Sequence, residues 1–111
     1  MNEFTRLLKT METLRDPETG CPWDKAQTLD SLKEYIIEEA YELVDAIESK
    51  DPVKITEELG DLLLQIVFAS QIMKESGKSA IPEVIKTLLS KLVRRHPHIF
   101  GEVDANTPLE V

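Results

Sequence analysis

The chain has 111 residues, of which 41% are apolar and 31% charged, with one cysteine and a net charge of −8. This composition is typical of one folded domain over residues 1–111, and it excludes a disulfide framework, a cysteine-based zinc site and a disordered segment. The sequence has no apolar run long enough to cross a membrane and no secretory signal, so we expect a cytoplasmic protein with no membrane partner.

Apolar residues recur at helical spacing along the chain, and breaker residues divide it into segments. The predicted helices cover residues 2–15, about 28–50, 52–75 and 82–95, with a loop at 21–27. Ser31 and Glu34 have the spacing of a capping box, and Asp51-Pro52 has the pattern of a helix N-terminus. Thr107-Pro108 resembles a helix start cut off after one turn. We expect an all-α bundle of four to five helices that forms the N-terminal part of a longer chain.

The third predicted helix is apolar nearly all round from Leu62 to Ala69, which indicates burial on every side. Its inner stripe comprises Ile55, Leu59, Leu62, Leu63, Ile66, Val67 and Met73, with Leu64 and Phe68 on another face. In the fourth helix we expect Val84, Ile85, Leu88, Leu89, Leu92 and Val93 to point inward. Because four helices cannot easily surround one of their own, we expect a homo-oligomer, a dimer or a tetramer, in which a partner completes the core.

The acidic charge lies in one quarter of the chain. Residues 34–61 carry ten acidic and two basic side chains, which accounts for the whole net charge. Nucleic acid and anionic membranes are poor partners for such a surface, because phosphate binding needs clustered lysine and arginine. Two interpretations remain: a solvated helix face, or a metal site.

Four carboxylates have the spacing of a metal site. Glu39 and Glu42 are three residues apart on one helix, and Glu58 and Asp61 repeat that spacing on the next. The short connection favours an antiparallel hairpin, which would bring the two pairs together, with Glu38 at the border of the same face. Oxygen ligands suit Mg²⁺ or Mn²⁺, and a bound Mg²⁺ usually bridges to substrate phosphates.

A glycine, Gly60, lies inside the third helix beside Asp61. Glycine in a helix interior costs about 1 kcal/mol relative to alanine. Close packing of helices and close approach of a ligand or metal both explain it, and the two explanations are compatible.

The end of the fourth helix is basic. Lys91, Arg94 and Arg95 share one face, where they either complement the helix dipole or hold phosphates. His96 and His98 lack the third ligand of a zinc site, so we favour a structural or substrate-contacting role. Trp23, the only tryptophan, is either a packing anchor or a platform for stacking a base.

Four motifs follow one another along the chain. They are Cys21-Pro22-Trp23-Asp24-Lys25-x-Gln27-Thr28, Glu38-Glu39-Ala40-Tyr41-Glu42, Glu57-Glu58-Leu59-Gly60-Asp61-Leu62-Leu63, and Arg94-Arg95-His96-Pro97-His98-Ile99-Phe100-Gly101. In this order they resemble the MazG-type nucleoside triphosphate pyrophosphohydrolases, over about residues 3–103. The resemblance implies an all-α fold, a dimer of helical bundles, Mg²⁺ dependence and cleavage of nucleoside triphosphates to monophosphate and pyrophosphate.

The resemblance also assigns roles to residues. It implies that Glu39, Glu42, Glu58 and Asp61 are metal ligands, and that Glu38 positions or deprotonates the attacking water. The expected substrate-binding residues are Trp23, Lys25, Gln27, Lys91, Arg94, Arg95 and His96. Two alternatives to this enzyme remain: a non-catalytic helical dimerisation or regulatory module of a longer tandem-domain protein, and an activity like that of phosphoribosyl-ATP pyrophosphohydrolase.

Overall fold

The computed structural model describes residues 1–101 and 106–110. Its helices are α1 (Glu3–Leu14), α2 (Pro22–Ala26), α3 (Leu29–Ser49), α4 (Pro52–Glu75), α5 (Ile81–Arg95) and α6 (Pro97–Phe100), followed by the 3₁₀ turn η1 (Pro108–Glu110). No strand occurs in these residues, which confirms the all-α prediction. Within the same ranges no helix is long and apolar enough to span a bilayer.

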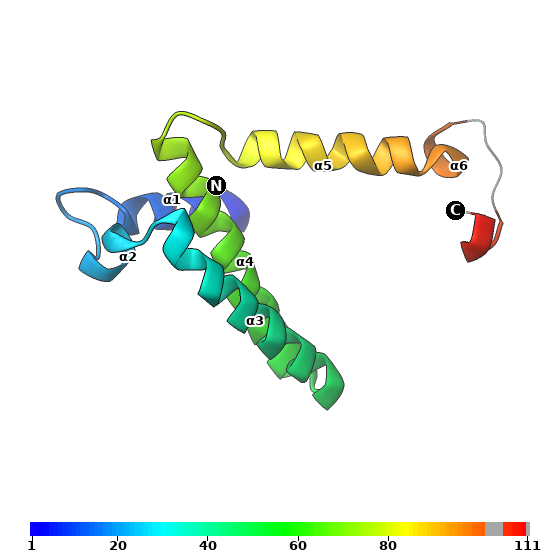
Figure 1. Ribbon diagram of the computed structural model, residues 1–111, viewed down its shortest axis with the longest axis horizontal. Coiled ribbons are helices and arrows are strands. Elements are labelled where there is room, and N and C mark those ends of the chain that lie inside the picture. Colours follow the sequence, from blue (N-terminus) through cyan, green and yellow to red (C-terminus); the bar gives the residue numbers. More distant parts are fainter. Residues whose placement is uncertain (102–105, 111) are drawn as a thin grey trace.

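The two longest helices, α3 and α4, form an antiparallel hairpin (Figure 1). Only two residues separate them. Lys50 takes the left-handed conformation with φ 61°, and the Asp51 side chain accepts a hydrogen bond from the Val53 N–H at 3.0 Å. The predicted helix start at Asp51-Pro52 is therefore confirmed, because the aspartate caps the helix and the proline occupies its first turn.

Helix α3 starts where it was predicted to start, but its capping pair differs from the prediction. Its N-cap is Thr28, and the capping box pairs Thr28 with Ser31 rather than Ser31 with Glu34. Thr28 Oγ1 accepts from the Ser31 N–H at 3.1 Å, and Ser31 Oγ accepts from the Thr28 N–H at 2.8 Å. The short helix α2 occupies the predicted loop, with Pro22 in its first turn.

The buried core lies at one end of the hairpin. Met11 of α1, Leu32 of α3, and Val67 and Phe68 of α4 are at most 2% exposed. Burial on every face of α4 was expected here: Val67, on the inner stripe, and Phe68, on another face, are buried, whereas Leu63, Leu64 and Ile66 are 38–48% exposed in one chain. Phe68 is in fact the largest side chain of the core, because α1 and the α2 segment cover the face of α4 that carries it.

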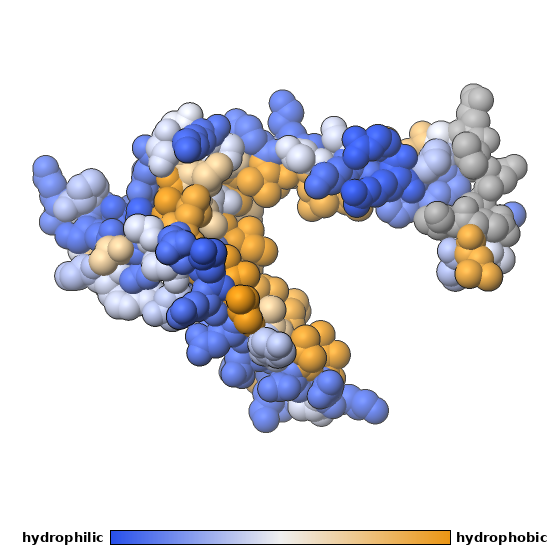
Figure 2. Space-filling model, in the orientation of Figure 1, coloured by the Kyte–Doolittle hydropathy of each residue, from blue (hydrophilic) through white to orange (hydrophobic). Residues whose placement is uncertain are grey.

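Helix α5 runs away from the hairpin (Figure 1). Its first residue, Ile81, is buried, but the six apolar side chains predicted to point inward are 40–54% exposed. That prediction is wrong within this chain, because α5 meets α4 near Ile81 and Pro82 and then leads away from it. The exposed apolar side chains of α4 and α5 border the open angle between the two helices (Figure 2).

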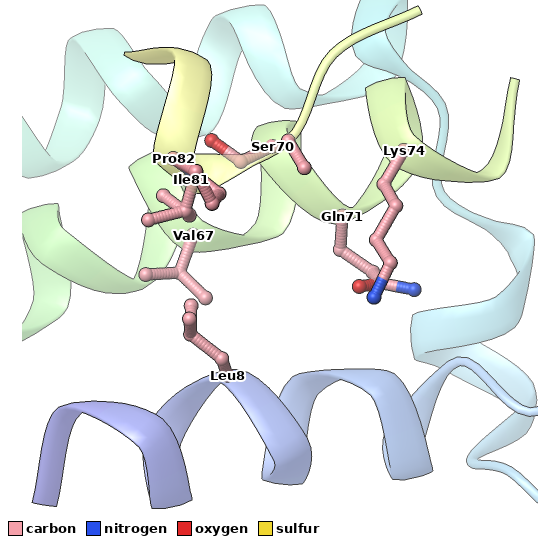
Figure 3. Close-up of a pocket in the computed structure, with 8 residues that line it drawn as sticks. Leu8, Val67, Ser70, Gln71, Lys74, Ile81 and Pro82 are labelled. Carbon is pink, nitrogen blue, oxygen red and sulfur yellow. The ribbon is translucent and has the colours of Figure 1, made fainter. Parts of the chain in front are cut away.

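A cavity of about 330 Å³ lies where α1, α4 and α5 meet (Figure 3). Leu8, Val67 and Ile81 form its apolar lining, and Gln71 and Lys74 lie at its polar side. The Lys74 ammonium is already paired with Glu12 at 3.3 Å. The cavity belongs to the core end of the hairpin, since none of the acidic residues of residues 34–61 lines it.

Candidate metal centre

Three carboxylates from facing helices converge on the hairpin. Glu39 of α3 and Glu58 and Asp61 of α4 each place one oxygen within 4.8 Å of the oxygens of the other two. Glu39 and Glu58 are partly buried and Asp61 is exposed. The convergence follows from the antiparallel pairing, which sets the middle of α3 against the first half of α4.

The other two acidic candidates border this group. Glu42 is exposed and lies outside the closest trio, yet its charge acts on both Glu39 and Glu58. Glu42 and Glu58 line the same surface hollow. Glu38 is exposed and contributes to the negative field at Glu39. The ligand and catalytic roles of these residues stay predictions.

The acidic cluster is electrostatically costly without a cation. Partial burial, followed by the charge of Asp61, raises the pKa of Glu39 above its ordinary value. The same two causes, in the same order, raise the pKa of Glu58. Glu58 Oε2 is also buried, and no described residue forms a hydrogen bond with it. A hard divalent cation fits this donor set, since it would ligate the unpartnered oxygen and offset the repulsion.

The α2 segment lies against the hairpin near these carboxylates. The Trp23 ring meets the Tyr35 ring edge-on with centroids 5.7 Å apart, and the Phe68 ring at 6.4 Å. Tyr35 precedes Glu39 by four residues, which places them on the same face of α3, about 6 Å apart along the helix. Trp23 is anchored at this edge but remains 50% exposed, so its packing role is clear and a stacking role stays a prediction.

The two polar candidates of this segment make local hydrogen bonds. Gln27 donates through Nε2 to the Trp23 carbonyl at 3.0 Å, and its Oε1 accepts from Ser31 Oγ at 2.8 Å. The Lys25 ammonium lies 3.4 Å from the Pro17 carbonyl. These bonds fix the course of the backbone around Trp23.

Residues 27–100 match the model of the MazG nucleotide pyrophosphohydrolase domain. The chain belongs to the MazG family. It is 56% identical over 99 residues to the nucleoside triphosphate pyrophosphohydrolase/pyrophosphatase MazG of Thermotoga maritima, covering 89% of this chain and 38% of that protein. It is 46% identical over its full length to the nucleoside triphosphate pyrophosphohydrolase of Escherichia coli K12, of which it covers 42%. The chain thus spans about two fifths of these curated relatives.

A solved structure supports the fold of this MazG domain. The crystal structure of a mazG-related protein from Thermotoga maritima superposes with a TM-score of 0.76, covering 96% of this chain and 90% of that one. The two sequences are 24% identical, so the likeness concerns the fold.

The basic end of the MazG domain is not brought to the carboxylates within one chain. Lys91, Arg94 and Arg95 are exposed on the far part of α5, which leads away from the hairpin (Figure 1). The described residues give them no salt bridge. His96 Nδ1 lies 2.6 Å from the Leu92 carbonyl, and its ring is 5.4 Å from that of His98.

Two polar residues that the sequence did not single out are also notable, one next to the carboxylate cluster and one at the far end of α4. Gln65 lies one turn beyond Asp61 on α4 and is 7% exposed, and its Oε1 has no hydrogen-bond partner in residues 1–101 and 106–110. Arg15 follows α1 and contacts both α2 and α4. The sequence signal for Gln65 is a polar residue among the apolar residues of α4. Nothing local identifies Arg15, because its partners are distant in sequence.

Proposed function

We propose that this chain hydrolyses nucleoside triphosphates to nucleoside monophosphate and pyrophosphate with the help of Mg²⁺. The observation that carries the proposal is the convergence of Glu39, Glu58 and Asp61, with an unpartnered oxygen on Glu58, in a domain of the MazG family. The names of the curated relatives agree with this activity. Because the chain covers only part of those relatives, the activity of this domain by itself is what the experiment below measures.

In this proposal the acidic residues have two roles, metal binding and proton transfer. Glu39, Glu42, Glu58 and Asp61 hold Mg²⁺, which when bound neutralises charge on the phosphates and lowers the pKa of water. Glu38, exposed beside Glu39, accepts a proton from the water that attacks the α-phosphorus. The bond from that phosphorus to the bridging oxygen breaks as the new oxygen–phosphorus bond forms, and pyrophosphate leaves. Much of the rate enhancement comes from positioning and electrostatic stabilisation.

The nucleoside end is assigned to the α2 segment. The exposed half of Trp23 offers a face on which a base stacks, and its edge-on contact with Tyr35 keeps that face in place. Lys25 and Gln27 lie beside it and supply polar contacts to the nucleotide. Such stacking tolerates every base, so selectivity has to come from polar contacts.

We also propose that the active form is a homo-oligomer, with the dimer as its smallest unit. The six apolar side chains of α5 that follow Pro82, together with Leu59, Leu63 and Ile66 of α4, are 40–54% exposed in one chain. A second copy would cover this large apolar surface. Its α5 would then bring Lys91, Arg94, Arg95 and His96 to the substrate phosphates, which the α5 of the same chain does not reach.

The test is a product analysis with matched variants. The purified chain is incubated with each common NTP and dNTP, dUTP and phosphoribosyl-ATP, in Mg²⁺ or in EDTA, and the products are separated by ion exchange. We expect monophosphate and pyrophosphate only with Mg²⁺, their loss in Glu42→Gln, and full activity in the control Glu48→Gln, an exposed acid of α3 outside the cluster. Diphosphate and inorganic phosphate as products would contradict the assigned site of attack.

Two other outcomes would favour the alternative functions. No turnover by a chain whose helicity is normal by circular dichroism would support a regulatory module. Turnover of phosphoribosyl-ATP alone would support the related pyrophosphohydrolase. Sedimentation of the wild-type chain at several concentrations tests the oligomer, and a monomer at every concentration would refute it.

A further inference from the structure

One arginine ties together three segments of the chain. Arg15 follows α1 directly, and its side chain is 9% exposed. Its guanidinium makes two hydrogen bonds to the Glu75 carboxylate at the end of α4, Nη2 to Oε1 at 2.6 Å and Nε to Oε2 at 3.0 Å. Its Nη1 donates to the carbonyls of Asp24 and Gln27, both at 2.8 Å, where α2 ends.

These contacts stabilise the C-terminal end of α2. A helix of five residues is too short to be stable by itself, and its Asp24 carbonyl has a long backbone hydrogen bond, 3.4 Å from the N–H of the C-cap Gln27. Arg15 adds shorter hydrogen bonds to the carbonyls of Asp24 and Gln27, and Glu75 holds the guanidinium in place. The hydrogen bonds from Arg15 keep the pKa of Glu75 below its ordinary value, so the carboxylate stays ionised and the pair stays formed at neutral pH.

The Arg15 guanidinium also lies next to the aromatic contact between Trp23 and Phe68. The Arg15 Cζ lies 5.7 Å from the centre of the Phe68 ring, and the same ring meets Trp23 edge-on. Arg15 therefore sets the backbone of α2 from one side while Phe68 and Tyr35 fix the Trp23 ring from the other. The planar fork of arginine makes these bonds together, and lysine offers a single ammonium in their place.

We propose that Arg15, held by Glu75, is a positioning residue for nucleotide binding: it fixes Trp23 and Gln27 at the distance from the carboxylates that the nucleoside end of the substrate requires. This inference rests on the proposed function. It assigns Arg15 no contact with substrate or metal, since its donors are engaged by Glu75 and by the carbonyls of Asp24, Lys25 and Gln27. Its effect should therefore appear in substrate binding and leave the metal site intact.

The test compares Arg15→Lys with Arg6→Lys. Arg6 is on helix α1, and the one salt bridge that it makes within the described residues, to Glu3, is exposed on both sides. For Arg15→Lys we expect KM for the Mg²⁺–nucleotide to rise by at least about tenfold, because charge-assisted bidentate bonds are lost. We expect kcat to stay within about threefold and the affinity for Mg²⁺ to be unchanged. Arg6→Lys should match the wild type in all three.

The single tryptophan gives a second readout. Trp23 emission reports only the α2 segment, so Arg15→Lys should shift the emission maximum to longer wavelength and increase quenching by acrylamide. Glu75→Gln, which keeps one hydrogen-bond acceptor but removes the charge, should produce both changes to a smaller degree. Combined with Arg15→Lys it should add little, because both variants break the same contact.

The outcomes separate the two proposals. An unchanged KM in a folded Arg15→Lys chain would overturn the positioning role, and so would equal losses of helicity, kcat and Mg²⁺ affinity, which indicate a general structural role. If the wild type turns over no nucleotide, the proposed function fails. The positioning role is then tested by titrating Trp23 emission with Mg²⁺ and a non-hydrolysable nucleoside triphosphate. Equal dissociation constants for wild type and Arg15→Lys, or no binding, would overturn it.

Discussion

Alanine at Gly60 and alanine at Gly77 are expected to change stability in opposite directions. A methyl group on either glycine would meet no heavy atom of a non-adjacent described residue within 4 Å, so packing contributes little in either case. The two positions differ in backbone conformation. Gly60 lies inside α4, whereas Gly77 lies in the loop after it with φ +68°. Comparing the two variants therefore measures how backbone conformation alone changes the free energy of unfolding.

The magnitudes follow from these conformations. Gly60→Ala should raise the free energy of unfolding by about 1 kcal/mol, the difference in helix propensity. Gly77→Ala should lower it by about 1–2 kcal/mol, the cost of the left-handed region for a residue with a Cβ. For a domain of this size, 1 kcal/mol corresponds to about 4–8 °C in Tm. Thermal and urea unfolding in EDTA, followed by circular dichroism, would measure both.

A loss of stability in Gly60→Ala would refute this reasoning. It would mean that another surface, such as a second copy of the chain, lies against α4 at this point in solution. A gain in stability accompanied by a loss of Mg²⁺-dependent turnover would instead favour close approach of a ligand beside Asp61. In both cases Gly77→Ala serves as the reference, and a neutral effect there would show that the loop takes another conformation.

The remaining predictions concern charge and burial. Without metal, the raised pKa values of Glu39 and Glu58 mean that the folded chain binds their protons more tightly than the unfolded chain. Their contribution to stability is complete below the ordinary glutamate pKa and is lost as pH rises through the raised pKa values. The urea midpoint of the metal-free chain should therefore fall as pH rises through this range. A rise in the midpoint would contradict the raised pKa values of Glu39 and Glu58. Gln65→Met should raise the free energy of unfolding by about 1 kcal/mol, since it removes an unpartnered buried carbonyl, and a loss in urea unfolding would reveal a partner. Phe68→Ala should cost about 3–5 kcal/mol, much more than Leu63→Ala, whose side chain is 40% exposed. A cost at Leu63 that grows with chain concentration in the same assay would reveal a covering subunit.

Local patterns were enough to predict much of the fold. The hairpin follows from two apolar periodicities joined by Asp51-Pro52, and these signals lie within a few residues of one another. The meeting of Glu39 with Glu58 and Asp61 follows in turn from i,i+3 spacing on two antiparallel helices. The spacing of the acidic residues thus predicted that Glu39, Glu58 and Asp61 meet, whereas Glu42 lies outside this trio.

The features that the sequence did not predict depend on distant contacts. Arg15 and Glu75 are 60 residues apart, and neither one lies in a pattern that indicates the other. Phe68 is central because α1 and Trp23 cover it, which periodicity within α4 cannot express. The direction of α5 depends on the loop after Gly77, and an apolar stripe predicts burial without saying which surface provides it.

Because the core lies at one end of the α3–α4 hairpin, the two ends of the hairpin differ in local stability. Near Leu32 and Phe68 the helices are held by packed apolar side chains, whereas in residues 40–60 only the small Ala46 is buried. Amide hydrogens of the turn end should therefore exchange with solvent by local opening, and those of the core end only by global unfolding. A cation bound by both helices would act as a cross-link at the weaker end. Mg²⁺ would then slow amide exchange around the turn more strongly than at Val67, and a chelator would reverse that selective protection.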